Sequence, residues 1–170
     1  YKADRAVATY KKWKSGLKPV VIQGWGTADT EALVKFIARD KVTYISASYS
    51  GHLTDPAGKS PRTKNKAPYN FFYGPSYSDG CRGLVQWAMD DWKGKGSKDQ
   101  PKFAHMGDNH PYPNAPKDAC GAYAEELGFE ILPSIVYSMK PADTKAQCLS
   151  LKDSGADYAF LGNTSGSNIS

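Results

Sequence analysis

The sequence predicts an α/β protein with parallel sheets, and three observations support this class. Segments with apolar residues at helical spacing alternate with short apolar runs typical of buried strands. The connections between them are short, which is typical of parallel strands covered by helices. The chain has 170 residues, of which 40% are hydrophobic and 23% charged, so it can bury a sizeable core.

The expected elements follow one another along the whole chain. A helix over residues 4–15 ends at Gly16 and precedes a short buried strand over 19–22. The Gly24–Gly26 loop then leads into a second helix, for which Thr27 is the expected N-cap. The later expected elements are strands over 42–46, 69–73, 103–106, 129–136 and 158–161, helices over 78–92, 114–127 and 142–153, and loops over 51–68, 93–98 and 107–113.

Four loops are the candidates for a ligand site. In open parallel sheets, ligands bind outside the carboxyl ends of the strands. This rule selects the loops Gly24–Thr30, Ala47–Leu53, Met106–Asn114 and Gly162–Ser167. All four are rich in residues that offer hydroxyls, amides and backbone N–H groups, which suits a polar small molecule.

The charge is distributed unevenly around a net value of +5. Residues 1–76 hold thirteen Lys or Arg and five Asp or Glu, whereas residues 77–170 hold nine and twelve. A lysine cluster lies at the end of the first expected helix, where it complements the helix dipole, and consists of Lys11, Lys12, Lys14 and Lys18. We therefore interpret them as a solvent-exposed face and expect no nucleic-acid partner.

One alternative reading is catalytic. His105, Asp108 and His110 lie in the sequence His-Met-Gly-Asp-Asn-His, which resembles a metallophosphoesterase loop and would make the chain an α/β metal-dependent hydrolase. Such a centre needs further ligands at other strand ends, and His52 is the only other histidine. We favour a polar loop after a strand, and expect neither a metal nor a catalytic residue.

The cysteines and the first glycine motif give weaker signals. Cys81, Cys120 and Cys148 are too few for a disulfide scaffold and leave the redox compartment open. Cys120 and Cys148 are interpreted as buried small hydrophobic residues rather than nucleophiles. Gly24-x-Gly26 is only part of a dinucleotide-binding motif, so no cofactor is expected.

The aromatic residues could either pack in the core or contact a ligand. Tyr69, Phe71 and Tyr73 share one face of their expected strand and are interpreted as core residues. Trp25 lies between two glycines at a strand end, where a ligand wall and a packing role are equally expected.

Several segments, taken in order, resemble one family. They are Gly24–Thr30, Tyr44–Ser50, Tyr69–Ser78, Asp108–Tyr112 and Ser150–Tyr158. Together they resemble the periplasmic substrate-binding proteins of branched-chain amino acid ABC transporters. The resemblance runs in register over nearly the whole chain.

This resemblance implies the type I periplasmic binding protein fold, with two Rossmann-like parallel-sheet lobes joined by a hinge. Residues 1–75 would be part of lobe one, 76–77 the hinge crossover and 78–170 part of lobe two. The family chain is about twice this length, so we expect an internal piece of a larger receptor with both lobes incomplete. The acidic partner that the family uses for a ligand ammonium would follow Ser170.

The implied function is binding rather than catalysis. The protein would be the periplasmic or extracytoplasmic component of an ABC importer, with its signal peptide removed. It would bind an amino acid or similar small carboxylate between the two lobes and deliver it to the membrane permease. A ligand sensor with the same fold is the remaining alternative.

The resemblance also implies roles for single residues. Thr27 and the helix amides beside it would hold a ligand carboxylate, and Tyr112 would lie over the ligand. Pro113 stands where the family usually has Gly, which removes a backbone donor. The expected ligand-binding residues are Trp25, Thr27, Ser48, Tyr49, Ser50, Tyr77, Tyr112, Asn163 and Thr164.

Overall fold

A computed structural model describes residues 2–60, 62, 65–138 and 143–163. The chain forms two compact units, which meet in the sequence between Ser76 and Tyr77. We describe each unit by itself, unit 1 as residues 1–76 and unit 2 as residues 77–170. Among the described residues, no helix is both long enough and apolar enough to cross a membrane.

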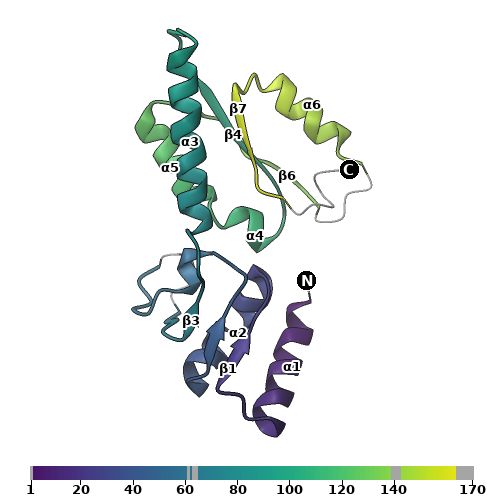
Figure 1. Ribbon diagram of the computed structural model, residues 1–170. Helices are drawn as coiled ribbons and strands as arrows, with labels where there is room; N and C mark the ends of the chain where they lie inside the picture. The colour runs from purple at the N-terminus through teal and green to yellow at the C-terminus, as the bar shows by residue number, and fades with distance from the viewer. Residues whose placement is uncertain (1, 61, 63–64, 139–142, 164–170) are drawn as a thin grey trace. The chain divides into compact units, whose positions relative to one another are not determined.

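Unit 1 is a parallel sheet with two packed helices (Figure 1). Its strands run in the order β1-β2-β3, and Tyr44 of β2 lies between Ile22 of β1 and Asn70 of β3. The core consists of Tyr10, Ile22, Leu33, Ile37, Val42 and Tyr44. The elements are α1 (Ala3–Gly16), β1 (Val21–Gln23), α2 (Thr27–Asp40), β2 (Thr43–Ile45), the 3-10 helix η1 (Gly51–Leu53) and β3 (Asn70–Phe71).

The aromatic strand of unit 1 is shorter and more exposed than expected. Only Asn70 and Phe71 pair with β2, and Phe71 and Tyr73 are 51% and 79% exposed. The core interpretation of these two side chains is therefore wrong. The register explains it, because Phe71 aligns with Ile45, on the opposite face of the pleat from the buried Tyr44 and Asn70.

Unit 2 is built around β4, whose neighbours all run parallel to it. β7 pairs with the middle of β4, while β5 and β6 pair with its beginning and its end. α3 and α5 pack together over a core that includes Val85, Met89, Phe103, Ala124 and Phe129. The elements are α3 (Tyr77–Gly94), β4 (Lys102–Asp108), α4 (Pro111–Asn114), α5 (Lys117–Leu127), β5 (Glu130–Ile131), β6 (Ile135–Tyr137), α6 (Lys145–Asp153) and β7 (Tyr158–Leu161).

Two expected elements of unit 2 are divided differently. The strand expected over 129–136 is split into β5 and β6, and Pro133 lies in the gap, where it has no N–H for a ladder. The loop expected over 107–113 is partly ordered, because β4 continues to Asp108 and α4 begins at Pro111. Proline at the first helical position has no N–H to leave unpaired, so it suits this start.

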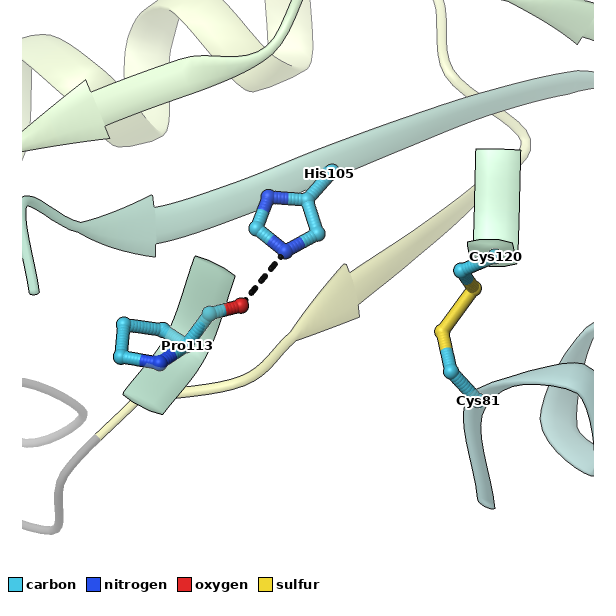
Figure 2. The surroundings of a disulfide bond; sticks show 4 residues. All are labelled: Cys81, His105, Pro113 and Cys120. Carbon is cyan, nitrogen blue, oxygen red and sulfur yellow. Dashed lines mark hydrogen bonds between the residues drawn. A yellow bond between two sulfur atoms is a disulfide. The ribbon is translucent and has the colours of Figure 1, made fainter. Parts of the chain in front are cut away.

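A disulfide fastens the helices of unit 2 (Figure 2). It joins Cys81 of α3 to Cys120 of α5, with their Cα atoms 5.6 Å apart. Cys120 is buried as expected, but it is a half of this bridge rather than a free thiol. Cys148 was expected to be buried and is exposed instead, because α6 carries no buried residue.

Candidate functional site

The polar loops of unit 1 follow the carboxyl ends of β1 and β2. Thr27 opens α2 and Ser48 follows β2, and their hydroxyl oxygens lie 2.8 Å apart in a buried hydrogen bond. Ser46 donates its hydroxyl to the backbone carbonyl of Ser48 at 2.9 Å. The structure thus joins two of the expected residues, Thr27 and Ser48, by a direct bond.

Ser50 stands apart from this bonded group. Its side chain is only 1% exposed, and its hydroxyl has no hydrogen-bond partner among the described residues. The chain from Ser46 to Ser50 is buried at every second residue, as in an extended segment, so Ser46, Ser48 and Ser50 share the buried side. A buried hydroxyl without a partner costs about 1–3 kcal/mol relative to a paired one. The Ser50 hydroxyl is therefore a buried donor whose hydrogen bond is not satisfied by the described residues.

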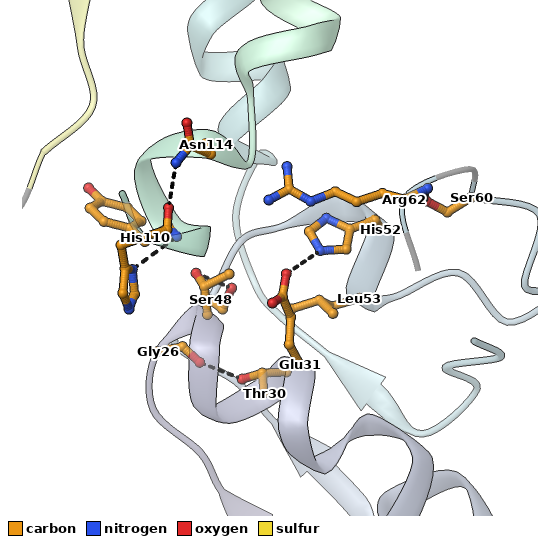
Figure 3. A network of polar contacts seen from close by, with 12 residues as sticks. Gly26, Thr30, Glu31, Ser48, His52, Leu53, Ser60, Arg62, His110 and Asn114 are labelled. Carbon is orange, nitrogen blue, oxygen red and sulfur yellow. Dashed lines mark hydrogen bonds and ion pairs between the residues drawn. The ribbon is translucent and has the colours of Figure 1, made fainter. Parts of the chain in front are cut away.

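Thr27 does not cap α2 as expected. Gly26 is the N-cap and Thr27 is the first helical residue, with its hydroxyl turned to Ser48. The hydroxyl of Thr30 reaches back to the carbonyl of Gly26 at 2.7 Å (Figure 3). The first backbone N–H groups of α2 have no side-chain cap, which leaves the positive end of its dipole uncompensated by a cap.

Two groups near this helix start were not foreseen from the sequence. The Oδ1 atom of Asp29 is buried and has no hydrogen-bond partner among the described residues. Glu31 Oε1 and His52 Nε2 lie 3.0 Å apart (Figure 3). This contact connects α2 to η1, and the side chains lie 21 positions apart in the sequence, so no spacing rule relates them.

The aromatic residues of the unit 1 loops differ in their surroundings. Trp25 is 69% exposed, so it does not act as a packing residue. The ring of Tyr49 packs edge-on against Phe72 and Tyr73, with centroid distances of 5.4 and 5.9 Å. Tyr49 therefore supports the loop with its ring.

Gly24 allows the close approach on which this loop depends. A Cβ atom placed on Gly24 would overlap the ring of Tyr44, closer to Cζ than real side chains come. Tyr44 is 2% exposed, and burial raises the pKa of its hydroxyl. The glycine before Trp25 is thus required by packing under the loop.

A cavity of about 540 Å³ lies beside the predicted loops. Tyr10 and Trp13 of α1 line it together with Trp25 and with Asp29, whose Oδ1 atom has no partner among the described residues. Ser48 and Ser50 are not among its lining residues. We give the serine loop more weight as a ligand site, because the cavity walls are mainly apolar and the polar groups expected to bind lie elsewhere.

In unit 2 the expected ligand-binding residues that the structure describes contact other residues of the same unit. Tyr77 and Tyr112 meet edge-on with ring centroids 5.1 Å apart, and burial raises the pKa of Tyr112. The Oδ1 atom of Asn163 accepts a hydrogen bond from the backbone N–H of Asp108 at 3.0 Å. Asn163 thus fastens the end of β4. Thr164 lies outside the described residues.

The histidines of the proposed metal loop have other partners. His105 Nε2 contacts the carbonyl of Pro113 at 3.0 Å (Figure 2), and burial lowers the pKa of the ring. His110 Nδ1 accepts from the backbone N–H of Tyr112 at 3.1 Å. Within the part of the chain that the structure describes, no three His, Cys, Asp or Glu side chains are grouped to hold a metal ion. The geometry gives the hydrolase reading no support.

Parallel sheets with polar loops at their strand ends place the chain in the α/β class. The family model described as periplasmic binding protein matches residues 1–170. The chain belongs to this family. No curated protein matches the chain in a sequence search.

Solved structures share the fold. A branched-chain amino acid ABC transporter protein from Thermus thermophilus with bound valine has a TM-score of 0.83 and 21% identity, covering 98% of this chain and 40% of its own. A substrate-binding protein from Aeropyrum pernix has a TM-score of 0.78 and 30% identity, covering 96% and 39%. A solute-binding protein from Rhodopseudomonas palustris HaA2 in complex with p-hydroxybenzoic acid has a TM-score of 0.72 and 18% identity, covering 97% and 41%.

Proposed function

We propose that this chain belongs to the extracytoplasmic solute-binding component of an ABC importer, which binds an amino acid or a similar small carboxylate. Family membership supports the class of protein, and the chain spans about 40% of the length of the structural relatives. Two of those relatives hold valine and p-hydroxybenzoic acid, and both ligands carry a carboxylate. The disulfide between Cys81 and Cys120 supports an oxidising compartment outside the cytoplasm.

The observation that carries the proposal is the unpartnered hydroxyl of Ser50. It is buried after β2, in the same loop as Ser48, whose hydroxyl binds Thr27 at the start of α2. A carboxylate is an acceptor with two oxygens, and it suits a hydroxyl donor beside the start of a helix. The Ser50 hydroxyl and the first amides of α2 are the groups proposed to receive it.

We also propose ligand contacts from unit 2. Tyr77 and Tyr112 offer a paired aromatic surface in unit 2, which suits an apolar ligand side chain. The assignment of units 1 and 2 to lobes one and two, and delivery of the ligand to a permease, belong to the same proposal. No catalytic step is proposed.

A paired thermal-shift series tests the carboxylate requirement. Valine and 4-hydroxybenzoate are compared with valinamide and 4-hydroxybenzamide. These amides keep the side chain or ring and lose the negatively charged carboxylate. A ligand at about 100 times its dissociation constant should stabilise the protein by ~2.7 kcal/mol. We expect one of the acids to raise the melting temperature and its amide to leave it unchanged. Equal shifts from an acid and its amide would contradict the proposal.

A further inference from the structure

A group of cations surrounds one aromatic ring of unit 1. α1 and α2 lie side by side (Figure 1) and bring Lys11, Lys35 and Arg39 around the ring of Phe36. The ammonium groups of Lys11 and Lys35 lie 5.6 and 5.3 Å from the ring centroid, and the Arg39 guanidinium carbon lies 5.3 Å from it. We call these four residues the Phe36 face.

The nearby countercharge is already engaged. Asp40 accepts hydrogen bonds from Arg39 Nε at 2.7 Å and Nη2 at 3.0 Å, and a third from the hydroxyl of Tyr10 at 3.0 Å. The Arg39 contact holds the pKa of the Asp40 carboxyl below its usual range. Lys11 and Lys35 form no ion pair with any residue that the structure describes. The Phe36 face therefore presents two exposed lysines whose charges are not neutralised locally.

The Phe36 face lies in the basic part of the chain. Residues 1–76 carry thirteen basic and five acidic side chains, whereas residues 77–170 have an acidic excess. Several like charges held around one ring repel one another, and the ring faces offset only part of that cost. An anionic partner would remove it. A second copy of the chain would instead place like charges opposite each other if it used the same face.

The kind of cation indicates the kind of anion. Arg39 is the group on this face that can grip a carboxylate with two parallel hydrogen bonds, and it already holds Asp40. Lys11 and Lys35 are point charges on flexible stems, which suit a diffuse field of anions better than a fixed protein surface. We propose that the Phe36 face binds the anionic phospholipid surface of a membrane.

Vesicle co-sedimentation tests this proposal with a matched pair of variants. The full chain is mixed with vesicles of phosphatidylcholine alone or with added phosphatidylglycerol, at low and at high salt. The test variant is Lys11→Gln with Lys35→Gln, and the control is Lys93→Gln with Lys98→Gln. The control residues are exposed lysines of unit 2, and both variants lose the same net charge. Melting curves confirm that both remain folded.

The expected result is specific to the Phe36 face. The unchanged protein binds vesicles that contain phosphatidylglycerol at low salt, and high salt abolishes the binding. The test variant binds about 30-fold more weakly, from roughly fivefold for each lysine near the surface, while the control is nearly unchanged. No binding at low salt, or an equal loss in both variants, overturns the proposal. Binding to immobilised poly-glutamate but not to vesicles would assign the face to an acidic protein instead.

Discussion

The two units place similar polar residues after their strands but use them differently. In unit 2, Asn163 binds the backbone of Asp108, and Asn114 donates to the carbonyls of Asp108 and His110 at 3.1 and 2.9 Å. In unit 1, Thr27 and Ser48 bind each other while the Ser50 hydroxyl has no partner among the described residues. The first arrangement fixes a loop, and the second leaves a buried hydroxyl that we propose donates to a ligand. Residue type alone does not separate these two roles.

Removal of the disulfide of unit 2 should have the largest effect on stability. Cys81→Ala with Cys120→Ala should lower the free energy of unfolding of unit 2 by about 3 kcal/mol, because the bridge closes a loop of 39 residues. Unit 1 should keep its stability. Hydrogen exchange during urea denaturation reports on the two units separately.

The exposed third cysteine provides the control. Cys148→Ala should change the free energy of unfolding by less than about 0.5 kcal/mol. A reductant should destabilise the unchanged protein and leave the double variant as it is. Equal destabilisation of both units by the double variant would show that they do not unfold independently.

A smaller loss of stability is expected when the packing between Gly24 and Tyr44 is disturbed. Gly24→Ala should destabilise unit 1 by about 2 kcal/mol, since the new methyl group overlaps the buried ring of Tyr44. Gly16→Ala is the matched change, because a Cβ there meets no atom within 4 Å. Chemical denaturation of both variants measures the difference. Equal stability of the two would contradict the close approach of Tyr44.

A smaller effect concerns the pH dependence of unit 2. Burial lowers the pKa of His105 in the folded protein below its usual value of about 6.5. The unfolded chain then binds a proton more readily than the folded chain. The stability of unit 2 is therefore full above about pH 6.5 and declines as the pH falls toward the folded pKa.

His105→Gln isolates this contribution, because glutamine keeps a donor for the carbonyl of Pro113 and does not titrate. Melting temperatures measured across the acidic range should show a shallower decline in this variant. The same slope with and without His105 would assign the pH dependence to other groups.

Much of the fold follows from local pattern in the sequence. Leu33 and Ile37 lie four positions apart in α2 and are both buried, as that spacing predicts, and Tyr10 is buried in α1. The extent of β3 and the burial of Phe71 depend on the register with β2, which is a long-range property. The disulfide is also long-range, since Cys81 and Cys120 meet only after α3 and α5 have packed.

The sequence predicted which loops and residue types form the candidate site, but it predicted few of their hydrogen-bond partners. The loops after β1 and β2 were selected by the rule for strand ends, and Thr27 and Ser48 do meet there. The pairing of Glu31 with His52 joins α2 to η1 and has no signal in the sequence. The lack of a partner for the Ser50 hydroxyl among the described residues depends on its surroundings, which residue type alone does not determine.

Ser50 is proposed to donate a hydrogen bond to the ligand, and titration calorimetry with Ser50→Ala tests this proposal. The probe is valine or 4-hydroxybenzoate, whichever stabilises the unchanged protein, and Ser48→Ala is the matched variant. Ser50→Ala should weaken binding by about 1–3 kcal/mol. It should leave the free energy of unfolding unchanged or raise it, because it removes a buried hydroxyl that has no partner among the described residues. Ser48→Ala should lower the free energy of unfolding by about 1 kcal/mol, since it breaks the bond to Thr27. Unaltered binding by Ser50→Ala, or a loss of stability equal to that of Ser48→Ala, would contradict the account.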